Sequence, residues 1–155
     1  RELVSAGTLN SHYGGFDVPR RSLYLPVIRN GLPDVLALFD AADANAVTAA
    51  RGDSTVPSQS LFLMNNKLVR DQAEALGRRL LAETPASDEE RVDRAMRLVC
   101  GRPADPIDLR EALVFLDRYT KTAITANSPP ADARLAAWRC YCQVLLCSNE
   151  FLYVD

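Results

Sequence analysis

The segment between residues 101 and 106 places a helix stop directly before a helix start. In Gly101-Arg102-Pro103, glycine is favoured just after the last helical residue and proline cannot continue a helix. In Asp105-Pro106, aspartate is a good N-terminal cap and proline suits the first helical turn. The segment therefore predicts two helices joined by a tight corner.

Apolar residues at helical spacing flank this corner. Ser87 and Glu90 form the pattern of a capping box and predict the start of the helix before the corner. The helices on the two sides carry their apolar positions at Val92, Ala95, Met96 and Val99, and at Leu109, Ala112, Leu113, Leu116 and Tyr119. A last helix is predicted over residues 131–148, with Leu135, Trp138, Tyr141, Cys142 and Leu145 apolar.

Two further helices are predicted upstream, over residues 57–65 and 67–82. Pro57 suits a first turn, and either Asn65 or Asn66 is placed to cap the second helix. One kinked helix over residues 57–82 is the alternative.

The four cysteines have no Cys-x-x-Cys spacing, so no zinc, thioredoxin or c-type haem motif is present. They are predicted to be buried small apolar residues, or else to form a disulfide from Cys100 to the last helix.

The N-terminal third is less regular. Residues 1–9 indicate the end of a helix, and residues 34–39 a short helix opened by Pro33. Residues 20–29 are β-rich, but Pro26 cannot donate to a β-ladder, so a short extended segment is expected. The predicted fold is mainly α, a bundle-like domain of five to six helices with an irregular N-terminal third. Short connections predict antiparallel packing of consecutive helices.

Composition sets limits on partners. The net charge of −2 argues against a nucleic-acid surface, and no apolar run approaches the ~20 residues of a membrane span. Because the chain begins with arginine, we read residues 1–155 as one domain forming part of a longer protein.

Candidate catalytic residues are few. His12 is the only histidine and lies in a glycine-rich loop, where an exposed surface role is the more common one. Asp40 and Glu150 are the carboxylates best placed to act as acid or base. No local spacing pairs two carboxylates, so neither hydrolysis nor a metal site is predicted from it.

Candidate binding residues are mostly basic or amide side chains. Arg20 and Arg21 could grip an anion with paired N–H donors, or bond acids and carbonyls of the same domain. Arg51, Asn65 and Asn66 belong to a polar stretch over residues 51–66. Because buried amides must be hydrogen-bonded, this stretch is interpreted as an internal brace, with ligand binding as the alternative.

Several of these blocks resemble a known family. The blocks are Arg20-Arg21-Ser22-Leu23-Tyr24, Ala37-Leu38-Phe39-Asp40, the polar stretch, Gly101-Arg102-Pro103, and the ending Ser148-Asn149-Glu150-Phe151-Leu152-Tyr153-Val154-Asp155. Together they resemble the planctomycete cytochrome-c-associated C-terminal domain of unknown function, the PSD family. The chain departs from that family's pattern at Gly52-Asp53 and in its extra cysteines.

The resemblance implies an exported parent, periplasmic or at the cell surface, with haem in another domain and no cofactor in this chain. Export would favour a disulfide at Cys100 or Cys140. We therefore expect a non-catalytic structural or interaction module whose partners are neighbouring domains and possibly a glycan. One alternative is an enzyme domain acting on a carbohydrate or other anionic polymer, with Arg20, Arg21, Arg51 and Asn66 reading the substrate. Another is a redox role for Cys140 and Cys142.

Overall fold

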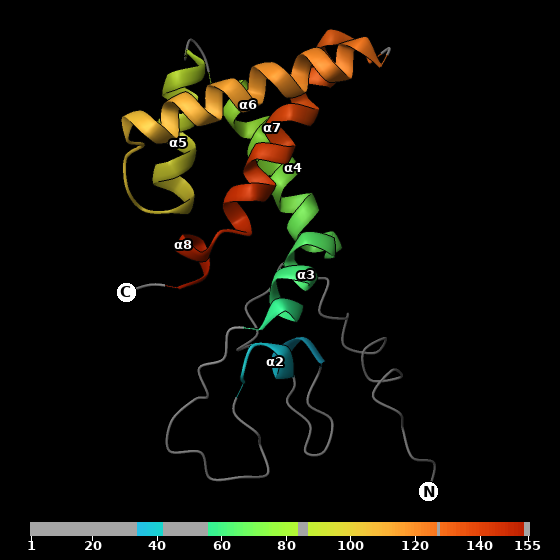
Figure 1. The fold of residues 1–155 in the computed structure, drawn as a ribbon, viewed down its shortest axis with the longest axis vertical. Helices are drawn as coiled ribbons and strands as arrows, with labels where there is room; N and C mark the ends of the chain where they lie inside the picture. The colour runs from blue at the N-terminus through green and yellow to red at the C-terminus, as the bar shows by residue number, and fades with distance from the viewer. Residues whose placement is uncertain (1–33, 42–55, 84–86, 127, 154–155) are drawn as a thin grey trace, which may run out of the picture. The chain divides into compact units, whose positions relative to one another are not determined.

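The computed structural model describes residues 34–41, 56–83, 87–126 and 128–153. Every regular element in these residues is a helix, which confirms the mainly α prediction (Figure 1). The helices are α2 (Asp34–Leu38), α3 (Pro57–Asn65), α4 (Lys67–Ala82), α5 (Asp88–Val99), α6 (Pro106–Thr125), α7 (Pro130–Leu146) and α8 (Asn149–Leu152). The helix and the extended segment predicted over residues 1–9 and 20–29 lie outside the described residues.

The chain divides into two compact units, Arg1–Phe62 and Leu63–Asp155. In the first unit, Gln59 is buried and joins α3 to the end of α2. Its side-chain amide donates to the carbonyl of Leu38 at 2.9 Å, and its Oε1 accepts from the backbone N–H of Val56 at 3.3 Å. The rings of Phe39 and Phe62 pack edge to face beside it, with centroids 5.9 Å apart. The internal brace expected in the polar stretch is therefore provided, within the described residues, by Gln59.

The helical pattern breaks at Asn66, so the prediction of two helices is confirmed over the single kinked helix. Asn66 has an extended backbone, and its Oδ1 accepts from the N–H groups of Leu68 and Val69 at 2.8 and 3.3 Å. Such a cap satisfies donors that the first helical turn leaves without partners.

The predicted corner between α5 and α6 is also confirmed. Cys100 ends α5, and Gly101 follows with a φ of +74°, a left-handed conformation that glycine adopts without steric cost. Asp105 then caps α6 in a capping box with Asp108. At the other end of α5, Ser87 and Glu90 form the expected capping box.

The core of the second unit lies where α4 meets α7, which run alongside each other in opposite directions (Figure 1). Trp138 of α7 is fully buried there, with α5 and α6 completing the cluster. The most extensive contact is thus between two helices separated by α5 and α6 in the chain. The expectation that consecutive helices make the main antiparallel contacts missed this pairing.

The close approach of α4 and α7 depends on Gly77. A Cβ atom at this position would lie 3.2 Å from the backbone nitrogen of Arg139 and 3.5 Å from Cβ of Trp138. Glycine lowers helix propensity by up to ~1 kcal/mol relative to alanine, so its position inside α4 reflects packing.

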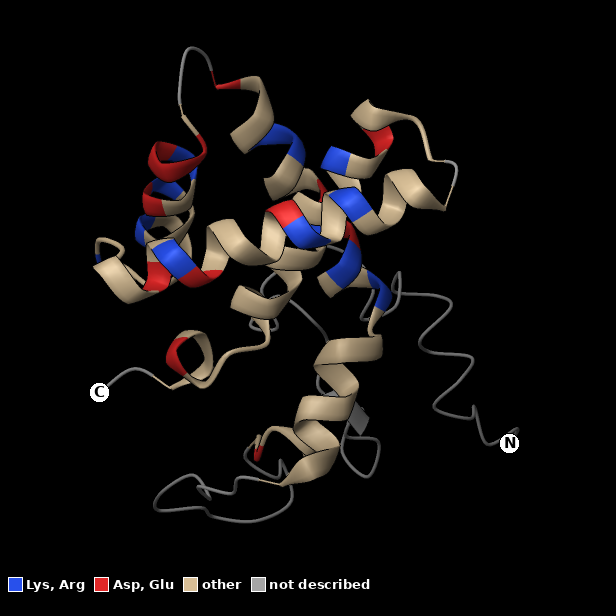
Figure 2. Ribbon diagram, turned by 45° about the horizontal axis from the view of Figure 1, so that its top comes forward, with Lys and Arg blue, Asp and Glu red and all other residues tan. Residues whose placement is uncertain are grey.

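The predicted last helix over residues 131–148 ends earlier than expected. α7 stops at Leu146, and the hydroxyl of Ser148 donates to the carbonyl of Leu145 at 2.7 Å. The same hydroxyl accepts from the N–H of Phe151 at 3.3 Å and so caps the short helix α8. Charged residues of both signs occur along α4 and α5, whereas α3 has none (Figure 2).

Replacing Gly77 with leucine should force α4 and α7 apart. Overpacking of this kind costs roughly 1–3 kcal/mol of unfolding free energy, measurable by urea denaturation. Ala75→Leu is the matched control, because Ala75 is exposed on the same helix and its substitution should change stability by less than ~0.5 kcal/mol. Equal stability of the two variants would contradict the close contact at Gly77.

Candidate functional site

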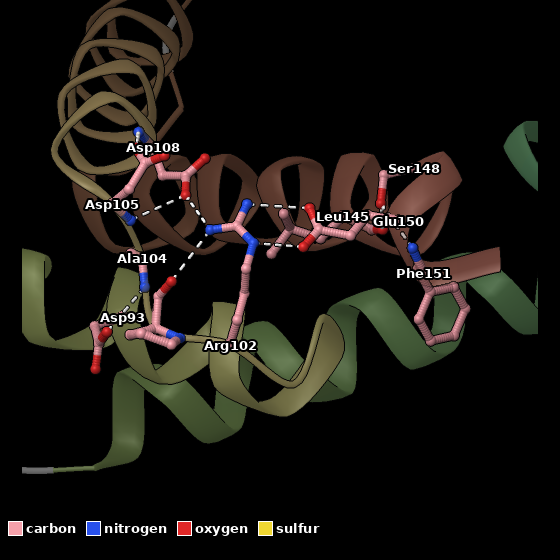
Figure 3. Close-up of polar contacts among 10 residues, drawn as sticks. Asp93, Arg102, Ala104, Asp105, Asp108, Leu145, Ser148, Glu150 and Phe151 are labelled. Carbon is pink, nitrogen blue, oxygen red and sulfur yellow. Dashed lines mark hydrogen bonds and ion pairs between the residues drawn. The ribbon is translucent and has the colours of Figure 1, made fainter. Parts of the chain in front are cut away.

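The guanidinium of Arg102 is held at the corner between α5 and α6 (Figure 3). Its Nε and Nη2 donate to the two carboxylate oxygens of Glu150 on α8, a bidentate pair in which Nη2 and Oε2 are 3.1 Å apart. Its Nη1 donates to Oδ2 of Asp108 at 2.6 Å and to the carbonyl of Pro103 at 3.1 Å. Four of the five donors of a guanidinium are therefore engaged within the protein.

Asp108 has two tasks in this network. Its Oδ2 accepts from Arg102 and also from the backbone N–H of Asp105, at 3.0 Å, which completes the capping box of α6. The hydrogen bond from Arg102, with a smaller contribution from the N–H of Asp105, lowers the pKa of the Asp108 carboxyl below its ordinary value. The hydrogen bonds to Glu150 and Asp108 in turn raise the pKa of Arg102.

A pocket with a volume of about 300 Å³ lies beside this network. Its walls come from the end of α5, the first half of α6, the end of α7 and the start of α8. The lining is mostly apolar, with charged groups at Arg102, Asp108, Glu111 and Glu150; the apolar and weakly polar residues are Met96, Cys100, Ala112, Phe115, Tyr141, Val144, Leu145 and Ser148.

Tyr141 joins this pocket to the core. Its ring packs edge to face on Trp138, with centroids 5.9 Å apart, and against Phe115 at 6.5 Å. Burial raises the pKa of its hydroxyl, with smaller contributions from Cys142, Asp108 and Cys100. The phenol therefore stays protonated throughout the physiological pH range.

The four cysteines are free thiols in the structure, so the disulfide considered for Cys100 is not formed. Cys142 lies in the core, and burial raises the pKa of its thiol to about 12. Burial also raises the pKa of Cys100 and Cys147. The interpretation as small apolar residues fits Cys142 best, whereas Cys140 is half-buried on the same helix.

Of the predicted catalytic residues, Glu150 is the one that the structure places at the pocket. Its side chain is 44% exposed and paired with Arg102. Asp40 lies in the first unit, where it ends α2 with a φ of +53°, a conformation that aspartate tolerates better than most residues. His12 lies outside the described residues.

Of the predicted binding residues, Asn66 and Asn65 lie at the junction of α3 and α4. Asn65 is exposed, so the expectation of two buried amides is wrong for it; the last turn of a helix turns this side chain to solvent. Asn66 is half-buried and does not line the pocket. Arg20, Arg21 and Arg51 lie outside the described residues.

The residues that build the site were not singled out from the sequence. Arg102 was interpreted only as part of a helix stop and Tyr141 only as a helix position, and Asp108 was not considered. The charge network requires Arg102 to lie beside Glu150, and these two residues are 48 positions apart in the chain. The one local signal for this network was an arginine placed between a helix stop and an aspartate cap.

A family comparison matches residues 5–116 to the model described as PSD1: Protein of unknown function (DUF1553). The chain belongs to the PSD1 family. The PSD1 match includes Arg102 and Asp108 and stops within α6, so α7, α8 and the ending quoted for the family resemblance lie beyond it. No curated protein and no solved structure matches the chain.

Two further properties of the described residues concern membranes and metal ions. None of the helices there is both long and apolar enough to cross a membrane. No group of three or more histidine, cysteine, aspartate or glutamate side chains in that part of the chain is arranged to hold a metal ion.

Arg102→Met should release both carboxylates. The pKa of Asp108, followed by NMR titration, should rise toward the ordinary value of about 3.9. Because this pKa is depressed in the folded protein, the pair stabilises the fold above the unfolded-state pKa, and this stabilisation is lost as pH falls through the folded-state pKa. The variant should therefore lose less stability than the wild type as the pH falls below about 3.9, the unfolded-state value.

Amide hydrogen exchange is a second measurement on the Arg102→Met variant. The amides of α8 should exchange faster in Arg102→Met, because Glu150 loses its anchor. Arg97→Met is the control, since Arg97 pairs only with Asp93 on its own helix. Unchanged exchange in α8 would show that the pair does not hold this helix.

The thiols should differ sharply in reactivity. With a pKa of about 12, roughly 10⁻⁴ of Cys142 is thiolate at pH 8, and the core shields it further. Peptide mapping after alkylation of the native protein should find Cys142 unmodified when Cys140 is already labelled. After unfolding, four thiols should react with or without reductant; fewer without reductant would indicate a disulfide.

Proposed function

We propose that this PSD1 chain is a non-catalytic interaction module. The observation that carries the proposal is that two of the candidate polar residues in the described part of the chain, Asn66 and Glu150, are occupied in holding the fold. Asn66 caps α4, and Glu150 is bound bidentately by Arg102. A catalytic carboxylate needs to be free to exchange protons with a substrate, and Glu150 is instead neutralised by a structural partner.

The charge of the pocket argues in the same direction. Recognition of an anionic polymer needs cationic donors that are free to turn toward the ligand. The one guanidinium lining this pocket is committed to two carboxylates and a carbonyl. The alternative of an enzyme acting on a carbohydrate or other anionic polymer thus gains no support from this site and stays a hypothesis.

An apolar row on α6 supports a contact surface. Ile107 and Val114 are 57% and 62% exposed, and their spacing of seven residues places them on one face of the helix. Two exposed aliphatic side chains on one helix face offer a neighbouring domain a small apolar contact, which burial on association would stabilise. The neighbouring domain of a longer protein is the partner that we propose for this row.

The wider setting follows from the resemblance of the sequence to the planctomycete family. We propose that the module is the C-terminal part of an exported multidomain protein that carries a cytochrome-c-like domain elsewhere. Haem would then be held by that other domain. A glycan is the alternative partner in the same setting.

The test is an association measurement between this chain and the preceding domain of its parent, expressed separately. Calorimetry should detect binding, and the double variant Ile107→Lys with Val114→Lys should weaken it at least tenfold. Burying one such side chain contributes about 1.5–3 kcal/mol, and each 1.4 kcal/mol corresponds to a factor of ten. Glu89→Lys is the control, because Glu89 is exposed on α5.

Two outcomes would overturn the proposal. The first is the absence of any association, with identical melting temperatures of the domains alone and mixed. The second is cleavage of a polysaccharide by this chain, measured as released reducing ends and abolished by Glu150→Gln. The second result would support the enzyme hypothesis instead.

A further inference from the structure

The pocket beside Arg102 has the size and walls of a small ligand site. Its volume of about 300 Å³ is at the lower end of the ~300–1,000 Å³ typical of ligand pockets. Its apolar walls include Met96, Phe115 and Leu145, which are contributed by three different helices. The pocket therefore suits the apolar body of a small molecule.

The charges on its rim favour a cation. Three carboxylates and one guanidinium line the pocket, and the guanidinium is already shared by Asp108 and Glu150. The third carboxylate, Glu111, is exposed and forms no ion pair with any described residue. Glu111 is thus the group that remains to neutralise a positively charged ligand, four residues before Phe115 on the same face of α6.

The hydroxyl of Tyr141 gives a second indication of a ligand. The Tyr141 residue is 7% exposed and lines the pocket, and its hydroxyl makes no hydrogen bond within the described residues. No buried side-chain oxygen or nitrogen in that part of the chain lacks a partner, so this hydroxyl is one that solvent reaches. It lies within electrostatic reach of Asp108, Cys100 and Arg102, all of which line the same pocket. The oxygen is therefore available to accept a hydrogen bond from a bound group.

The aromatic rings add to the same preference. Phe115 and Tyr141 stand together in the wall, with centroids 6.5 Å apart. The face of an aromatic ring attracts a cation within about 6 Å of its centroid. A carboxylate, a phenol oxygen and two rings are all complementary to an ammonium group.

We infer that this pocket binds a small organic amine, with the apolar body between α5, α6 and α7 and the ammonium at Glu111 and Tyr141. An anionic ligand would meet three carboxylates, and a neutral one would leave Glu111 without a partner. The inference goes beyond the role of an interaction module, because the pocket and the apolar row on α6 share no residue.

The test compares three probes of similar shape on the full chain at low ionic strength, where charge contributions are least screened. They are 2-phenylethylamine, 2-phenylethanol and 3-phenylpropionate, titrated while amide NMR shifts are followed. The amine should bind about tenfold more tightly than the alcohol, the acid should not bind, and the shifts should map to the residues that line the pocket.

Two variants assign the roles of the residues. Glu111→Gln should weaken amine binding about two- to fivefold, the contribution of a partly exposed ion pair, and leave alcohol binding unchanged. Glu89→Gln, an exposed position away from the pocket, should change neither. Tyr141→Phe should also weaken the amine selectively, with an unchanged fold verified by its NMR spectrum.

The inference fails if the alcohol or the acid binds as tightly as the amine. It also fails if Glu111→Gln binds the amine like the wild type, or if no probe binds at millimolar concentration. These results are separate from the association measurement with a neighbouring domain, which does not involve the pocket.

Discussion

The second unit depends on the contact between α4 and α7 at Gly77. Because this position has no side chain, the backbone of α7 comes close enough for Trp138 to be fully buried. One and two turns further along α7, Tyr141 and Leu145 line the pocket. The site is thus built on a helix whose position is set by a glycine on a different helix.

Arginine has two different roles in this unit. Arg78 and Arg97 pair with acids four residues away on their own helices, at exposed positions where such pairs add little stability. Arg91 is only 11% exposed and donates to the carbonyl of Leu80 at 3.0 Å, near the end of α4. Together with Arg102, it connects separate helices, which the pairs within one helix cannot do.

Helix ends that are set by residues within three or four positions of each other were predicted well from the sequence. Ser87, Asp105 and Gly101 mark helix ends by bonding or conformation within a single turn, and the structure has each of them in that role. Asn66 was identified as one of two possible caps for the same reason. Local hydrogen bonds of this kind are set by the residue and its nearest neighbours.

Contacts between distant residues were not predictable in this way. The periodicity of α4 and α7 shows which face is apolar but not which helix covers it, so their pairing was missed. The partner of Glu150 lies 48 residues earlier, and the residues next to Glu150 do not indicate it. The interpretation of the polar stretch as a brace stays a prediction for residues 51–55, which lie outside the described residues. In the described part of the stretch, Gln59 is the buried amide, whereas Asn65 is exposed.

The double use of Asp108 has a consequence for communication across the corner. One carboxylate oxygen serves both the start of α6 and the cation that anchors α8. Any event that moves Arg102 away from Asp108 changes the electrostatic environment of that oxygen. It therefore also changes the hydrogen bond by which the oxygen caps the N-terminus of α6. The beginning of one helix and the attachment of another are therefore thermodynamically linked through a single shared atom.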